Sequence, residues 1–353
     1  MAIPITAIMC AAIFIPWVVV WLWITPLPDT VQEQVDDAID LGLDGIIVYV
    51  DQAGEAPVLY CAGLKNREAK VPTDPHALFK IASISKLYIA VATAKLISDQ
   101  RLSLNDTLAS LLPELDGRLA NAHKITLRML LQHRSGIPDW IEDPAFPWTR
   151  SVRDIDEVLE FVLDDPAEFE PDSRYDYSNT NYLLIGKILD RTLGYHHHQY
   201  IQEEILVSLG LTHTFGLLSE VMPEEVSSGY YTKHDGDVKG LDFVSPGSSM
   251  VATAQDVGIF LKALNDGSLL DDDEQAIYSS VYVYEHTGLI PGYSSIARYR
   301  KDIDTVVIQF VNTSGGNTWT LSEVVCNRII RILKRSNNAS NAKGATKLKE
   351  PQR

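Results

Sequence analysis

The chain has 353 residues, of which 46% are hydrophobic, and it carries a formal net charge of −17 at pH 7. This length and apolar content suffice for a sizeable core in one two-part domain. The acidic balance argues against nucleic acid as a partner, because a surface that binds phosphates must be basic.

The first feature along the chain is an apolar segment from Ile3 to Ile24. About 20 apolar residues span the hydrocarbon of a bilayer, and tryptophans such as Trp17, Trp21 and Trp23 favour its interface. We therefore expect residues 1–28 to be a membrane anchor, with a signal segment that is cleaved as the alternative.

No Lys or Arg occurs in residues 1–64, so the acidic stretch after the apolar segment has no positive charge to hold it inside the cell. We expect a single-pass protein of the cell membrane, with the domain that follows this segment outside the cytoplasm. If the segment is cleaved, the protein would instead be secreted or periplasmic.

The three cysteines do not form a disulfide framework. Cys10 lies in the apolar segment, and Cys61 and Cys326 fall in a predicted strand and a predicted helix, where cysteine usually acts as a small buried hydrophobe. Whether Cys61 and Cys326 pair is left open.

The remaining sequence predicts strands, then helices, then strands. Gly45 to Asp51 and Val58 to Gly63 predict a hairpin, and the middle of the chain is mainly helical. Two further antiparallel strands are expected at Ser294–Arg300 and Thr305–Asn312, before an amphipathic helix from Trp319 to Lys334. The expected fold class is α/β plus all-α, with an antiparallel sheet flanked by helices and an inserted helical subdomain.

The expected domain boundaries follow from this order. The main domain covers 29–335, with a sheet part from about 29–82 and 271–335 and a helical part of about 83–270. Residues 336–353 are polar and are expected to form a disordered tail.

The string Ser83-Ile84-Ser85-Lys86 is the first along the chain that contains candidate catalytic residues. It precedes an apolar run from Leu87 to Ile97 that predicts a buried helix. Ser83 is therefore expected at a helix N-terminus, where unpaired N–H groups and the helix dipole stabilise developing negative charge. Lys86 follows just under one turn later, on the same face.

This pair could form an activated nucleophile. A lysine amine in water has a pKa of about 10.4, but burial beside cationic or dipolar groups can lower it to roughly 7–8. The neutral amine of Lys86 would then accept the proton of Ser83. A Ser three residues before a Lys is common by chance, so the string alone equally fits a polar helix start.

Two later strings change that balance: Tyr177-Ser178-Asn179, in a polar loop ahead of a helix, and His286-Thr287-Gly288. In this order the three strings resemble the serine β-lactamase and penicillin-binding-protein superfamily. The similar branch holds class C β-lactamases, D-alanyl-D-alanine carboxypeptidases of Streptomyces type and related esterases. The resemblance covers nearly all of residues 40–335 and implies a β-lactamase/transpeptidase-like fold.

The resemblance implies roles for the first two strings. Ser83 is the nucleophile of an acyl-enzyme, and Lys86 and Tyr177 move the proton between Ser83 and the leaving group. Asn179 binds the substrate amide. A phenolate at Tyr177 would need nearby cations, for which Lys86 and a charged His286 are the candidates.

The third string is expected on an edge strand beside the cleft, again by resemblance. His286 and Thr287 line the site, Gly288 lets the substrate backbone approach, and the N–H of Leu289 completes an oxyanion hole with that of Ser83. Class C β-lactamases carry Lys where this chain has His286, whereas Streptomyces-type carboxypeptidases carry His. A protonated imidazole at this position would attract a substrate carboxylate.

The sequence thus predicts a serine hydrolase with a small peptide or ester substrate. D-Ala-D-Ala-type carboxypeptidase activity on cell-wall peptides is favoured, and an esterase or weak β-lactamase using the same site is the first alternative. A non-catalytic peptide-binding or scaffold descendant is an alternative of another class, although it would not need the intact reactive residues. The chemistry requires no cofactor, and the oligomeric state is left open.

Other histidines invite comparison with metal ligands and bases. The run His196-His197-His198 could bind a metal, but a solvated run near a helix start is favoured, and no metal site is predicted. His133 is expected to be a hydrogen-bonded structural residue, because the Lys–Tyr pair already serves as the base.

Overall fold

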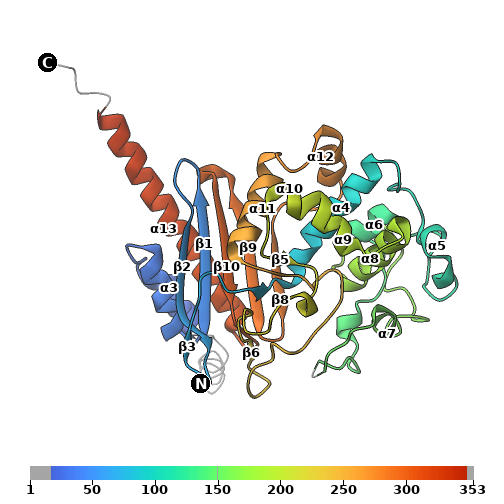
Figure 1. Cartoon of the computed structure of the whole chain (residues 1–353), viewed down its shortest axis with the longest axis horizontal. Helices are drawn as coiled ribbons and strands as arrows, with labels where there is room; N and C mark the ends of the chain where they lie inside the picture. Colours follow the sequence, from blue (N-terminus) through green and yellow to red (C-terminus); the bar gives the residue numbers. More distant parts are fainter. Residues whose placement is uncertain (1–16, 149, 348–353) are drawn as a thin grey trace, which may run out of the picture.

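A six-stranded antiparallel sheet forms the centre of the protein in a computed structural model that describes residues 17–148 and 150–347. The strand order is β3-β2-β1-β10-β9-β8, so strands from both ends of the chain share one sheet and β8 lies at its edge (Figure 1). The strands are β1 (Gly45–Gln52), β2 (Val58–Asn66), β3 (Val71–Pro72), β8 (His286–Ile290), β9 (Tyr293–Arg300) and β10 (Thr305–Val311).

Helices cover both faces of this sheet (Figure 1). One face packs against α3 (Val31–Asp40) and α13 (Thr318–Lys347), and the other packs against α11 (Ala254–Asp266). Strand β1 is therefore buried along residues 45–51, which explains its continuous apolar run. Helix α13 continues through the polar segment from Ser336, where a disordered tail was expected, and no proline interrupts it.

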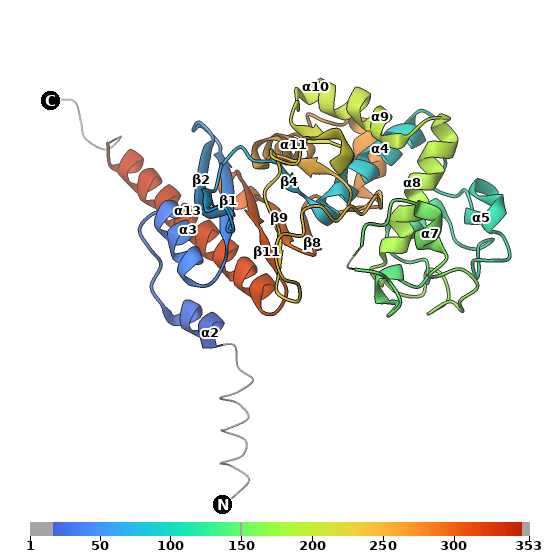
Figure 2. The same ribbon diagram turned by 60° about the horizontal axis from the view of Figure 1, so that its bottom comes forward.

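The inserted helical part lies beyond the other face of the sheet (Figure 2). Its central helix, α4 (Ser85–Ser98), is buried at every position from 85 to 94, which explains why its sequence has no polar face. The predicted fold class, an antiparallel sheet with flanking helices and a helical insertion, is confirmed. The other helices are α5 (Leu108–Leu111), α6 (Leu127–Leu131), α7 (Ile155–Leu159), α8 (Asn179–Leu193), α9 (His197–Ile201), α10 (Val207–Leu209) and α12 (Asp272–Ser279).

Short strands connect the two parts. The pairs β4–β7 and β5–β7 are antiparallel, and β6 pairs with β11 in parallel. Their bounds are β4 (Phe79–Lys80), β5 (Thr214–Phe215), β6 (Tyr230–Tyr231), β7 (Val251–Ala252) and β11 (Thr313–Ser314). Strand β4 leads directly into the segment that contains Ser83.

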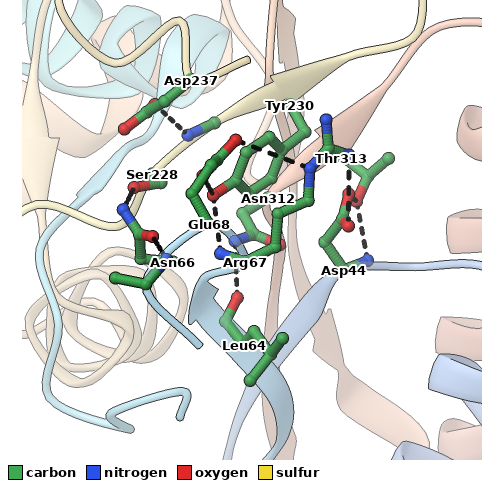
Figure 3. A network of polar contacts seen from close by, with 12 residues as sticks. Asp44, Leu64, Asn66, Arg67, Glu68, Ser228, Tyr230, Asp237, Asn312 and Thr313 are labelled. Atoms are coloured by element: carbon green, nitrogen blue, oxygen red, sulfur yellow. Dashed lines mark hydrogen bonds and ion pairs between the residues drawn. The ribbon is translucent and has the colours of Figure 1, made fainter. Parts of the chain in front are cut away.

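A polar network fastens β6 to the sheet (Figure 3). The Tyr230 hydroxyl donates to Glu68 Oε2 at 2.6 Å and accepts from the Arg67 backbone N–H at 2.8 Å. The Arg67 guanidinium lies 4.1 Å from the centre of the Tyr230 ring and 3.4 Å from Asp44 Oδ1. Because the segment before β6 bridges to Leu78, the network also supports the approach to Ser83.

Arg328 of α13 binds the segment that follows α2 (Trp17–Ile24). Its buried guanidinium donates to Gln34 Oε1 at 2.5 Å and to the carbonyl oxygens of Leu22, Thr25 and Pro26 at 2.6, 2.9 and 2.8 Å. These carbonyls include those at the C-terminal end of α2, which have no partner within the helix. Arg328 thus binds the end of α2 to the domain, in addition to the apolar packing of Leu22 in the core under α13.

Most of the expected anchor, Ile3–Ile24, lies outside the described residues, and its described remainder forms α2. Within the described ranges, no helix reaches the length and hydropathy needed to cross a membrane. Cys61 and Cys326 are both free thiols. They belong to the cores on opposite faces of the sheet, which explains why they do not pair.

Replacing Arg328 by Lys should lower the free energy of unfolding by about 2–3 kcal/mol, because an ammonium cannot reproduce the fork of donors that reaches these acceptors. Urea denaturation measures the change. Arg331→Lys, at an exposed position of the same helix, is the control and should stay within about 0.5 kcal/mol of the unmodified protein. Equal stability of the two variants would show that the hydrogen bonds of Arg328 do not stabilise the fold.

Candidate active site

Ser83 lies in a 3-10 turn, η1 (Ala82–Ile84), that continues directly into α4. The preceding residue, Ala82, has a φ of 50°, a left-handed conformation that costs an L-residue about 1–2 kcal/mol. The turn is held by the Ile81 N–H, which donates to Met250 O at 3.1 Å, and by Ser295 Oγ, which donates to Ile81 O at 2.8 Å. Ser83 therefore stands at the start of a buried helix, on a strained and tightly supported backbone.

Lys86 reaches Ser83 as its spacing predicts. Its Nζ lies 3.0 Å from Ser83 Oγ, 2.8 Å from Asn179 Oδ1 and 3.1 Å from the carbonyl oxygen of Gly247. The side chain is fully buried, and this burial lowers the pKa of Lys86 to about 7, against an opposing effect of the Asp139 carboxylate.

Three acceptors match the three N–H groups of a protonated Lys86. Once neutral, the amine can keep its donations to Asn179 and Gly247 and direct its lone pair at the Ser83 hydroxyl. Because the pKa lies near neutrality, a substantial fraction of molecules holds this base form at physiological pH.

Tyr177 is the second group in contact with the nucleophile. Its hydroxyl donates to Ser83 Oγ at 3.1 Å, and its ring stacks on His133 with centroids 4.4 Å apart. Burial raises the pKa of Tyr177 well above its ordinary value, so the group is a phenol and not the phenolate that we considered from the sequence. Tyr177 is therefore a proton donor in the free protein.

His133 supports this arrangement, as expected of a structural residue. Its Nδ1 accepts from the Ser178 backbone N–H at 3.2 Å, next to Tyr177 in the chain. Burial lowers the pKa of His133 to about 3, so the ring is neutral. The imidazole thus positions the Tyr177 ring without acting as a base.

Asn179 begins α8 and bridges two other side chains. Its Oδ1 accepts from Lys86, and its Nδ2 donates to Asp139 Oδ2 at 2.9 Å. Binding of the substrate amide by Asn179, expected from the resemblance, remains a prediction. Asp139 was not predicted from the sequence. Its one sequence signal is the turn composition of residues 136–139, immediately before η3 (Trp140–Glu142).

His286 lies at the start of edge strand β8, with its ring 6.2 Å from that of Tyr177. Its Nδ1–H donates to the carbonyl oxygen of Thr287 at 2.5 Å. Burial, and secondarily the charge of Lys86, lower the pKa of His286 to about 4. In the free protein His286 is therefore neutral at pH 6 to 8, and attraction of a substrate carboxylate by a charged imidazole remains a prediction.

Gly288 is needed for packing within the protein, and the expected approach of a substrate backbone at this residue remains a prediction. A Cβ at this position would lie 2.4 Å from Ile81 O, 2.4 Å from Ser295 Oγ and 2.9 Å from the Cβ of Ala82. The missing side chain thus lets β8 pack against the turn that carries Ser83. Thr287 is half-buried and Leu289 is 50% exposed on the same strand, and their roles toward substrate remain predictions.

Two adjoining cavities of about 270 and 280 Å³ open beside Tyr177 and His286. Their shared wall includes Tyr175, and the first cavity is also lined by His133 and Tyr282. Five of the residues that line the two cavities carry aromatic rings, Tyr175, Tyr177, Tyr282, His133 and His286, and these rings offer flat surface to a bound group. The only Lys or Arg among the described residues that line either cavity is Arg298, and it is bound to Glu323 and Asn327 at 2.6 and 2.8 Å.

The histidine run lies away from this cleft, at the start of α9. It is not the solvated run that the sequence favoured, because His197 is 1% exposed and His198 is half-buried. Both side chains pack between α9 and the segments around Gly186 and Gly216.

Known proteins are similar to this chain in sequence and in fold. The family description "Beta-lactamase" matches residues 29–283. Protein flp of Staphylococcus aureus is 27% identical over 210 residues, which are 58% of this chain and 40% of that protein. A putative D-alanyl-D-alanine carboxypeptidase of Escherichia coli is 27% identical over 269 residues, or 72% of this chain and 56% of that protein. The chain thus spans about half the length of these relatives.

Solved structures extend the comparison to the whole fold. The D-amino acid amidase of Ochrobactrum anthropi, in complex with L-phenylalanine amide, superposes with a TM-score of 0.76 at 25% identity. That match covers 87% of this chain and 98% of the amidase chain. A penicillin-binding protein of Bacillus halodurans, with a TM-score of 0.71 at 20% identity, shares the fold.

Replacing Gly288 by Ala should slow acylation of Ser83 by a fluorophosphonate about 100-fold, because the new Cβ must push β8 away from Ile81. The second-order labelling rate measures the effect. Gly240→Ala is the matched control, since a Cβ there meets no atom within 4 Å. Equal labelling rates would show that the position of β8 does not govern the nucleophile.

The labelling rate should also rise with pH and level off above pH about 7, because only the neutral amine of Lys86 accepts the Ser83 proton. Asp139→Asn should move this midpoint to lower pH, since the carboxylate stabilises the ammonium. Glu142→Gln, an exposed position one turn away, should leave the midpoint unchanged. A flat profile from pH 5 to 9 would exclude Lys86 as the base.

Proposed function

The chain belongs to the beta-lactamase family, and we propose that it is a serine hydrolase that cleaves small amides through an acyl-enzyme on Ser83. The observation that carries this proposal is the double contact at the nucleophile. Ser83 Oγ is 3.0 Å from the buried amine of Lys86 and 3.1 Å from the phenol oxygen of Tyr177. One neighbour can take a proton and the other can give one.

Acylation follows from this geometry. The neutral amine of Lys86 accepts the Ser83 proton as Oγ attacks the substrate carbonyl carbon, and the oxyanion forms near the N–H groups of Ser83 and Leu289. Tyr177 then donates its proton to the leaving nitrogen and is reprotonated from Lys86, which restores both groups. Water then attacks the ester carbon of the acyl-enzyme while Lys86 accepts a proton from it, and Tyr177 returns a proton to Ser83 Oγ. The products are a carboxylic acid and an amine.

An uncharged leaving group fits the cleft better than a terminal carboxylate. The imidazole of His286 is neutral near pH 7, and the guanidinium of Arg298 is already bound to Glu323. The aromatic wall formed by Tyr175 and Tyr282 suits an aromatic acyl side chain. We therefore favour amides of aromatic amino acids, and we take the D configuration from the name of the Ochrobactrum anthropi enzyme, a D-amino acid amidase.

The test compares kcat/KM of the full chain for D-phenylalanine amide, L-phenylalanine amide, a D-Ala-D-Ala peptide and p-nitrophenyl acetate. We expect D-phenylalanine amide to exceed its enantiomer and the peptide at least about tenfold, a difference of roughly 1.4 kcal/mol in transition-state binding. Intact-mass spectrometry should detect an acyl adduct on Ser83, and Ser83→Ala should lose both adduct and turnover.

Each other ranking replaces the proposal with a defined alternative. A preference for the D-Ala-D-Ala peptide would establish a carboxypeptidase, and turnover of the ester alone would establish an esterase. Correctly folded protein without any adduct would favour a non-catalytic peptide-binding descendant.

We further propose that the N-terminal segment attaches the domain to a membrane, with the catalytic part outside the cytoplasm. Trp21, Trp23 and Ile24 of α2 are 55, 74 and 77% exposed and continue the apolar sequence that begins at Ile3. Tryptophan favours the membrane interface. Through Arg328, the end of this segment is bound directly to the domain.

Full-length protein should therefore sediment with membranes and resist extraction by alkaline carbonate. Replacing both Trp21 and Trp23 by Gln should release a larger share into the supernatant, because it removes the aromatic contacts with the interface. Recovery of a mature N-terminus beyond residue 24 from the native host would instead identify a cleaved signal.

A further inference from the structure

Three consecutive histidines turn their rings toward one another at the start of α9. The ring centroids are 4.4 Å apart for His196 and His197, 4.3 Å for His197 and His198, and 4.8 Å for His196 and His198. One ring nitrogen of each residue lies within 4.8 Å of the other two. Such mutual proximity is unusual for neighbours in sequence, whose side chains normally diverge around a helix.

A carboxylate determines the tautomer of the central histidine. Asp190 Oδ1 accepts from the His197 backbone N–H at 2.5 Å and from His197 Nδ1–H at 2.7 Å. The lone pair of His197 therefore resides on Nε2, which is buried and has no hydrogen-bond partner among the described residues. A carboxylate behind a histidine is the arrangement that orients imidazole ligands in metal sites.

The second unpartnered ring nitrogen of the cluster belongs to His198. Its Nε2 lies 3.4 Å from Ser249 Oγ, whereas Nδ1 is buried over Gly216 without a partner in the described part of the chain. His196 is the exposed member, beside a cavity of about 340 Å³ that His198 also lines. Buried ring nitrogens without partners are rare, and a bound ion is one cause.

We propose that His196, His197 and His198 form a binding site for a divalent transition-metal ion, with Zn²⁺ as the reference occupant. Imidazole nitrogen is a preferred ligand of zinc, and three histidines leave a fourth position open to water from the cavity. This proposal stands on the histidine cluster alone and does not depend on the proposed hydrolase activity.

The site requires a small closure of the rings. In a tetrahedral complex, two Zn–N bonds of about 2.0–2.1 Å place their nitrogens about 3.4 Å apart, less than the 4.8 Å over which the three nitrogens extend. The exposed ring of His196 can make most of this adjustment by rotating its side chain. A π-helical turn, η4 (Gln202–Leu206), follows α9 directly, and such turns often accompany functional sites.

The cluster also borders the loop that supports the catalytic lysine. Ser249 contacts His198, and two residues earlier the carbonyl of Gly247 accepts from Lys86. A metal at the cluster would therefore fix a segment that contacts the active site from behind. Its role would be structural, because Ser83 and its partners need no metal for the steps described above.

Isothermal titration calorimetry of the full chain, purified without a polyhistidine tag, tests the site with Zn²⁺. We expect one Zn²⁺ per chain, and Co²⁺ in its place should show the visible absorption of a tetrahedral complex. His196→Gln, at an exposed position that should not disturb folding, should abolish the stoichiometric binding. Asp190→Asn should weaken it about 10–100-fold, because it removes the carboxylate that orients His197.

His123→Gln is the matched control, since that histidine is 76% exposed and pairs only with Asp116 in the described structure. It should retain the full affinity. Thermal unfolding gives a second readout, because Zn²⁺ should raise the midpoint of the unmodified protein but not that of His196→Gln. Absence of stoichiometric Zn²⁺ binding, or equal affinity in His196→Gln and His123→Gln, would overturn the proposal.

Discussion

The arrangement of the site depends on one constraint, which is that the amine of Lys86 is buried and must be satisfied by hydrogen bonds. Its acceptors come from three separate segments: the turn at Ser83, the start of α8 at Asn179 and the loop at Gly247. Burial lowers the pKa of the amine, and the same contacts fix these segments relative to one another. Burial of Lys86 thus both holds the three segments together and makes its amine a base.

The turn that carries Ser83, η1, contains locally unfavourable backbone. Ala82 adopts a left-handed conformation, and Gly288 leaves β8 without a side chain where it meets the turn. Strained backbone of this kind persists only where surrounding contacts determine it, and here Met250 and Ser295 bind Ile81 directly. The edge of the sheet therefore acts as a rigid support for Ser83.

The site needs both parts of the domain. Lys86 and Tyr177 belong to the helical part, whereas His286 and Gly288 belong to a strand near the other end of the sequence. The N-terminal and C-terminal strands pair directly in the sheet, with Ile46 opposite Val311, so β8 is positioned only after distant segments have met. Completion of the cleft is consequently coupled to folding of the whole sheet.

The sequence alone determined the features that depend on local order. The spacing of Ser83 and Lys86 placed both on one helical face, and the alternation and apolar runs predicted β1, β2, β9 and β10 close to their observed bounds. Those patterns arise from fixed helical and strand periods. Tertiary structure alone decided the charge of His286, the partner of Asp139 and the burial of His197, because these depend on desolvation and on contacts between residues far apart in the chain.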